Sequence, residues 1–272
     1  MAHYLVGEKS FASLLTVVLL RYLILASIAF LIFYGLKRRS WVSRKIQLLF
    51  PDRSDYGREI GYSLLSSVIF AVMGYIVFLT PLVKYTRAYF DITAYSTTYF
   101  VASIFLMVLL HDTYFYWTHR LMHRKAWFRI VHRVHHRSTN PSPWAAMAFH
   151  PLEAVMEAGI IVVIPFVMPV HPMAIGLFLL FMMIYNVYGH LGYELYPAHF
   201  SKRSFGRWIN TSVNHNMHHE YCMGNYGLYF LFWDRIMGTL HPDYDQKYDE
   251  VGNRKKVERE QDHPRAASSS AV

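Results

Sequence analysis

Long runs of hydrophobic residues, with few charged positions inside them, occupy most of the first two thirds of the chain. Three runs stand out, from Phe11 to Leu36, from Ile60 to Leu82 and from Thr97 to about Thr118. A helix of roughly 20 mostly apolar residues is long enough to cross the hydrocarbon core of a bilayer. The pattern therefore predicts three membrane-spanning helices.

Two shorter apolar runs follow, Ala154 to Val170 and Met173 to Gly189, separated by a turn at His171 and Pro172. They could span the membrane as a thin hairpin or enter it and return. Signals for β-strands are poor throughout. The predicted fold class is an all-α integral membrane protein with about four transmembrane helices, the last of which could be a short hairpin.

Composition and charge agree with this interpretation. Hydrophobic residues make up 54% of the chain and charged residues 17%, whereas roughly a quarter of a soluble domain is charged. The net charge of +9 could suggest nucleic acid as a partner, but the basic residues lie beside the apolar runs, as in juxtamembrane segments. We therefore expect a membrane and no nucleic acid.

The distribution of positive charge predicts the orientation. Seven Lys and Arg residues lie between 37 and 58, but only Lys84 and Arg87 lie between 83 and 96. The positive-inside rule places the first segment in the cytoplasm. The third span then returns to the cytoplasm near Trp117, where histidines begin to accumulate. The single cysteine, Cys222, rules out an intramolecular disulfide and suits a site facing a reducing compartment.

We divide the chain into three regions. Residues 1–110 form an N-terminal transmembrane region, and residues 111–242 form the region that carries the candidate chemistry. The last region, 243–272, is charged and then rich in Ala and Ser, which predicts a disordered polar tail. A cytoplasmic helical cap is expected from the segments 119–150 and 190–240.

Eight of the sixteen histidines form three tight clusters: His119 and His123; His132, His135 and His136; His215, His218 and His219. Histidines at i and i+4 lie on one face of a helix and can share a metal ion. Adjacent histidines point about 100° apart, so each group of three could serve two metal ions. Chance explains a single such pair, but not three clusters at the ends of predicted spans.

Eight histidines exceed the three or four ligands of one zinc ion, which favours a dinuclear site. Nitrogen ligands suit iron that works on O2, although zinc, copper and manganese stay open on ligand type alone. His190 ends the last apolar run on the same side as the clusters and is a ninth candidate ligand. His150 is a tenth, but capping its own helix would explain it equally well, because Pro151 follows it.

Four carboxylates near the histidines could orient imidazole rings by accepting their second N–H: Asp112, Glu153, Glu194 and Glu220. Asp112 and Glu194 are the preferred candidates. Glu153 and Glu220 are equally well explained as solvated acids. His111, two turns before His119, could line a pocket or simply pack between helices.

These residues resemble the fatty acid hydroxylase/sterol desaturase superfamily, whose pattern is HxxxH, HxxHH and HxxHH on a four-helix membrane scaffold. The resemblance runs from about Asp112 to Leu240. It includes the short motifs around His119, at Ala148 to Pro151, at Asn225 to Gly227 and at Trp233 to Arg235. The motifs around His150 and Asn225 are most similar to those of the sterol C5-desaturase branch. Some hydroxylases of the family carry another histidine where this chain has Glu194.

The resemblance implies an O2-dependent enzyme with two iron ions that hydroxylates or desaturates a membrane-dissolved lipid, such as a sterol or fatty acyl chain. No electron-donor domain is evident, so a separate electron-donor protein is expected. The alternative is a membrane metal-ion transporter or metal-binding protein, which would place ligands near the middle of the bilayer. A bis-histidine haem protein would leave six of the histidines without a role.

Overall fold

The computed structural model describes residues 10–262, with side chains as far as Arg254. It contains no β-strand in these residues, in agreement with the predicted all-α fold. The long helices are α1 (Phe11–Phe30, continued by a π-helical turn at Leu31–Leu36), α2 (Arg53–Phe78), α3 (Thr97–Met122), α5 (Pro151–Val167), α6 (Pro172–Gly189), α7 (Ser212–Tyr221) and α9 (Tyr244–Asp262). The short helices are α4 (Lys125–Trp127) and α8 (Phe232–Ile236).

Four segments are long and apolar enough to cross a membrane: Phe11–Leu36, Arg53–Phe78, Thr97–Met122 and Pro172–Gly189. Their outer faces carry stripes of apolar side chains. On α1, for example, Leu20, Ile24 and Ile28 are each about half exposed and recur once per turn. Such stripes are unfavourable in water but are what a helix presents to lipid. The prediction of a multi-pass membrane protein with four spans is confirmed.

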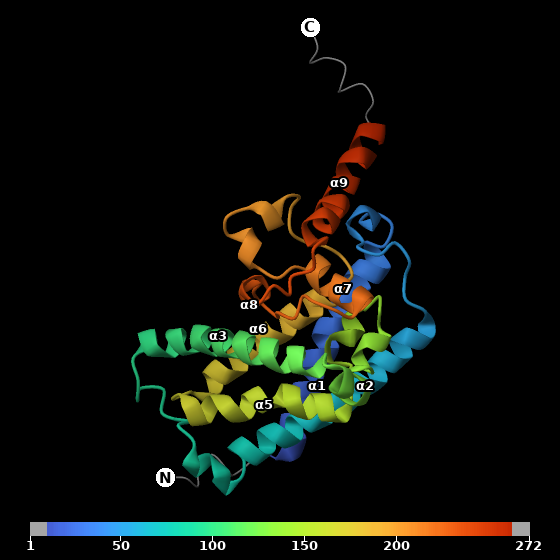
Figure 1. The fold of residues 1–272 in the computed structure, drawn as a ribbon. Helices are drawn as coiled ribbons and strands as arrows, with labels where there is room; N and C mark the ends of the chain where they lie inside the picture. Colours follow the sequence, from blue (N-terminus) through green and yellow to red (C-terminus); the bar gives the residue numbers. More distant parts are fainter. Residues whose placement is uncertain (1–9, 263–272) are drawn as a thin grey trace.

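The helix boundaries follow from local capping. Asp52 and Asp55 form a capping box at the start of α2, and the Ser96 side chain accepts the Tyr99 N–H at the start of α3. Helix α5 begins at Pro151, as the sequence predicts. The two short apolar runs become α5 and α6, which diverge from their shared turn. Helix α5 packs against α2 and α3, whereas α6 packs against α1 and α3 (Figure 1).

This packing gathers several helix ends at one end of the bundle. The end of α3, the residue that ends α6 and helix α7 bring histidines together there, and the first turn of α5 contacts one of these histidines, His132, through Glu153. The segments 123–150 and 190–243, the second of which contains α7 and α8, cover this end, and we refer to them as the cap. The core beneath the cap is apolar, with Tyr22, Met107 and Phe178 fully buried.

The predicted disorder of 243–272 is wrong for most of that segment, because residues Tyr244–Asp262 form α9. Its N-terminal half carries three buried side chains, Tyr244, Tyr248 and Val251, which are spaced at i, i+4 and i+7. They pack against Val213 and Met217 of α7. The high charge of the segment hid this narrow apolar stripe. Residues 263–272 lie outside the described part of the chain.

Candidate metal centre

Nine histidines from four parts of the chain converge beneath the cap. They come from the end of α3, the segment 128–137, the residue that ends α6, and α7. They form two groups, each able to hold a metal ion: group one is His119, His123, His132, His136 and His218, and group two is His135, His190, His215 and His219. These are the nine histidines of the predicted ligand set apart from His150.

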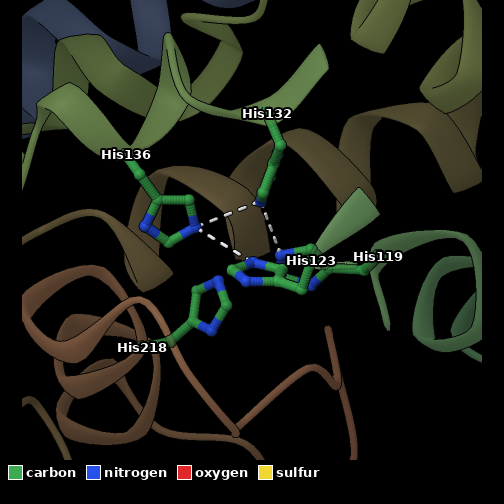
Figure 2. A group of neighbouring side chains, drawn as sticks. All are labelled: His119, His123, His132, His136 and His218. Atoms are coloured by element: carbon green, nitrogen blue, oxygen red, sulfur yellow. Dashed lines mark hydrogen bonds between the residues drawn. The ribbon is translucent and has the colours of Figure 1, made fainter. Parts of the chain in front are cut away.

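The five rings of group one point toward a common centre (Figure 2). The Nε2 atoms of His119 and His132 are 3.0 Å apart, and that of His136 lies 3.1 Å from those of His123 and His132. In group two, the Nε2 atom of His190 lies 3.1 Å from those of His215 and His219. It is 3.3 Å from the Nε2 atom of His135.

The hydrogen-bond partners of the Nδ1 atoms determine which nitrogen of each ring carries the hydrogen. Five Nδ1 atoms lie within hydrogen-bond distance of backbone carbonyl oxygens: those of His119 (Tyr226), His123 (Cys222), His190 (Asn186), His218 (Gly224) and His219 (Ser138). A carbonyl oxygen only accepts, so each of these Nδ1 atoms carries the hydrogen. In a neutral imidazole the Nε2 atom then bears a bare lone pair.

The Nε2 atoms, which face one another within each group, therefore cannot all form hydrogen bonds with one another. His190 and His219 both hold their hydrogen at Nδ1, yet their Nε2 atoms are 3.1 Å apart and cannot form a hydrogen bond. The Nε2 atom of His218 is buried with no hydrogen-bond partner in the described protein. Two nitrogens bound to one metal ion at about 2.1 Å and at right angles lie about 3.0 Å apart. The donor set and its spacing thus fit a metal ion in each group.

Burial keeps these rings in the form that binds metal. Outside the predicted spans, six ligand candidates have a pKa well below the usual histidine value, because burial disfavours the charged ring and neighbouring histidines oppose it further: His132, His135, His136, His215, His218 and His219. They are neutral at physiological pH, and neutral imidazole is the metal-binding form.

The turn after α7 brings carbonyl groups back to the site. Cys222, Gly224 and Asn225 all have positive φ, at 53°, 72° and 55°. This left-handed turn reverses the chain, so that the carbonyls of Cys222 and Gly224 face His123 and His218. Glycine is required at 224, since a Cβ atom there would lie 2.8 Å from the Thr239 carbonyl oxygen.

The two preferred carboxylates contact backbone and tyrosine groups rather than histidines. Asp112 accepts the N–H groups of Tyr229 and Phe230. Glu194 accepts the N–H of Val213 near the start of α7, at 3.1 Å, together with the Tyr196 N–H and the Tyr188 hydroxyl. Burial raises the pKa of Glu194, although these hydrogen bonds oppose the shift. Both residues therefore position the segments that carry the histidines.

Glu153 is the carboxylate that reaches a histidine. Its Oε1 atom lies 2.6 Å from Nδ1 of His132, and both side chains are buried. Glu220 makes no hydrogen bond through its buried Oε2 atom. His150 belongs to neither group, because its Nδ1 atom accepts the Leu152 N–H and caps α5. His111 pairs with the Tyr229 hydroxyl at 2.9 Å.

Asp234 is a site residue for which the sequence predicts no role, although it lies in one of the motifs that resemble the family. Its side chain is fully buried and accepts three hydrogen bonds, from the N–H groups of Tyr226 and Gly227 and from the Thr239 hydroxyl. Tyr226 in turn supplies the carbonyl that orients His119. Asp234 thus fixes one wall of group one without touching a histidine.

Replacing Glu153 with glutamine is expected to weaken metal binding by about 10- to 100-fold, since the carboxylate orients His132 and raises its basicity. Metal titration of the purified protein measures this. Glu157→Gln on the same helix is the matched control, because Glu157 forms no hydrogen bond or ion pair with a histidine of the described residues. Equal metal affinities in the two variants would show that Glu153 has no role in metal binding.

Comparison with known proteins agrees with this geometry. Residues 104–239 match the family described as fatty acid hydroxylase. Lathosterol oxidase of Rattus norvegicus is 30% identical over 194 residues, which cover 70% of this chain and 63% of that protein. A Delta(7)-sterol 5(6)-desaturase of Gibberella zeae is 28% identical over 67% of this chain and 55% of the relative.

A putative methylsterol monooxygenase of Dictyostelium discoideum is 32% identical over 56% of this chain and 55% of that protein. The matched part is thus less than two thirds of each of these relatives. No solved structure matches this chain. The family match spans half of the sequence, and the chain belongs to the fatty acid hydroxylase/sterol desaturase superfamily.

Proposed function

We propose that this protein is an O2-dependent di-iron oxidoreductase that hydroxylates or desaturates a membrane-dissolved lipid, with a sterol as the first candidate. One observation carries the proposal: nine imidazoles, eight of them buried, form two adjacent groups whose ring nitrogens converge. The groups adjoin, because the ring centroid of His219 in group two lies 5.0 Å from that of His136 in group one.

An all-nitrogen donor set with two metal positions suits iron and O2. The chemistry that such a pair of iron ions supplies is removal of hydrogen from an unactivated C–H bond, with O2 and two electrons as co-reactants. Desaturation removes two hydrogens from the substrate, and with two electrons and two protons O2 becomes two waters. Hydroxylation inserts one oxygen atom and releases one water.

The residues of the chain contribute positioning and exclusion of water. Backbone carbonyls hold the imidazole hydrogens at Nδ1, so that Nε2 faces the metal position in each oriented ring. The apolar core beneath the cap keeps bulk water away from the substrate side of the site. A lipid would reach the site between the helices without leaving the membrane.

The names of the relatives support a sterol substrate. Two of them act on a sterol at the 5(6) position or on lathosterol, and a third is a putative methylsterol monooxygenase. The positive-inside rule supports a site on the cytoplasmic face. Five exposed cations lie on the cap near group one: Arg124, Lys125, Arg129, Arg133 and Arg137. They suit an acidic electron-donor protein or anionic lipid headgroups.

The test uses the full chain purified in detergent and loaded with iron. We expect two iron ions per chain and no haem absorbance. With O2, an electron donor and lathosterol, a 5(6)-desaturase forms a conjugated diene that absorbs ultraviolet light, whereas a hydroxylase forms a sterol diol visible by mass spectrometry. Haem absorbance, or metal transport into vesicles without lipid oxidation, would contradict the proposal.

A further inference from the structure

A small cavity lies directly beneath the metal centre, between α2, α3, α5 and α6. Its walls include Phe115, Phe149, Met147, Met182 and Met183. Phe115 contacts the ring of His119 and Phe149 contacts that of His135, with ring centroids 4.9 and 5.1 Å apart. The cavity therefore begins against both groups of ligand candidates. Three of its wall residues are methionines, whose flexible side chains allow a cavity to change shape around a ligand.

Three polar residues also line this cavity: Glu157 of α5, His111 of α3 and Asn186 of α6. Glu157 is only 7% exposed, and its carboxyl group has no hydrogen-bond partner among the residues that the structure describes. Burial of an unpaired carboxyl group among apolar side chains is unfavourable. The other two polar residues are engaged, since His111 pairs with the Tyr229 hydroxyl and the Asn186 amide donates to the Ala146 carbonyl.

The positions of Glu157 and His111 relative to the metal centre follow from helix geometry. Glu157 is one turn beyond Glu153, which contacts His132. His111 is two turns before His119 on α3. At 1.5 Å per residue, Glu157 lies about 6 Å from Glu153 and His111 about 12 Å from His119 along the helix axes. A lipid in the cavity could then have one carbon at the metal centre and a polar group at Glu157.

We infer that Glu157 binds a hydroxyl group of the lipid substrate, which makes the substrate class a lipid alcohol such as a 3-hydroxysterol or a long-chain alcohol. This inference rests on the proposed function for the identity of the site as a lipid site. The carboxyl group and the hydroxyl satisfy one another inside the apolar cavity. A lipid without a hydroxyl would leave Glu157 unpaired.

Paired probes test this inference without measuring oxidation. Binding of radiolabelled lathosterol to the iron-loaded full chain in detergent is competed with lathosterol or with its 3-deoxy analogue. A second arm competes 1-hexadecanol against hexadecane, which distinguishes a sterol from a chain alcohol. The wild-type protein is expected to prefer the hydroxylated member of at least one pair by about tenfold, the effect of one buried hydrogen bond.

Three variants separate recognition of the hydroxyl group from the shape of the cavity. Glu157→Leu is expected to lose the preference, and Glu157→Gln to retain most of it, because an amide also donates and accepts. Met182→Leu, in the same cavity, is expected to change the affinities for both members of a pair by the same factor. Equal binding of the two members of both pairs by the wild type, or an unchanged preference in Glu157→Leu, would overturn the inference. That result would leave the proposed lipid oxidation untouched, so the experiment tests recognition of the hydroxyl group by Glu157 independently of the proposed function.

Discussion

Replacement of His218 or His135 by alanine is expected to reduce the metal content from two ions per chain to one or none and to abolish lipid oxidation. His218 belongs to group one and His135 to group two, and each is buried. The Nε2 atom of His218 has no partner in the described protein, so its lone pair serves only the metal position. Loss of a ligand should cost more than the roughly 10- to 100-fold that loss of an outer hydrogen-bond partner costs.

Metal analysis by mass spectrometry and an oxidation assay measure the two effects independently. His150→Ala and His199→Ala are matched controls, since His150 caps α5 and His199 pairs with Asp249 on the surface. Both controls should keep two ions, with at most the loss of about 1 kcal/mol that removal of a helix cap costs for His150→Ala. Full metal content and activity in both ligand variants would show that these nitrogens do not hold the ions.

The helices and the histidine clusters could be predicted because both depend on short-range spacing. Apolar runs of sufficient length determined the spans, and ligands at i and i+4 share a helical face whatever surrounds them. The division into groups is different. His135 and His136 are neighbours in the sequence, yet the structure assigns them to different groups. Only the packing of α3, α6 and α7 decides which ring faces which centre.

The carboxylates could not be assigned from the sequence for the same reason. Asp112 is two turns before His119 on one helical face, but the nearest donors are backbone N–H groups of Tyr229 and Phe230, more than a hundred residues later. Glu153 reaches His132 because the start of α5 packs beside the segment 128–132. Helix α9 was missed because only three of its described side chains are buried, within a strongly charged segment.

Replacement of Asp234 by alanine is expected to destabilise the protein by about 3–5 kcal/mol and to weaken metal binding in group one. The substitution leaves the N–H groups of Tyr226 and Gly227 without their acceptor, and each unsatisfied buried donor costs about 1–3 kcal/mol. It also removes the acceptor of the Thr239 hydroxyl. For a chain of this size the Tm should fall by roughly 10 °C.

The effect on the metal follows from the same contacts. Asp234 holds the backbone of Tyr226, whose carbonyl oxygen lies 3.0 Å from Nδ1 of His119, so that release of this segment frees the ring to rotate. Asp234→Asn keeps one acceptor oxygen and should give an intermediate Tm and metal affinity. Asp245→Ala, which removes an exposed acid from α9, should change stability by less than about 0.5 kcal/mol. If Asp234→Ala matched Asp245→Ala in both measurements, the backbone around Tyr226 would be held by other contacts, and Asp234 would have no part in orienting His119.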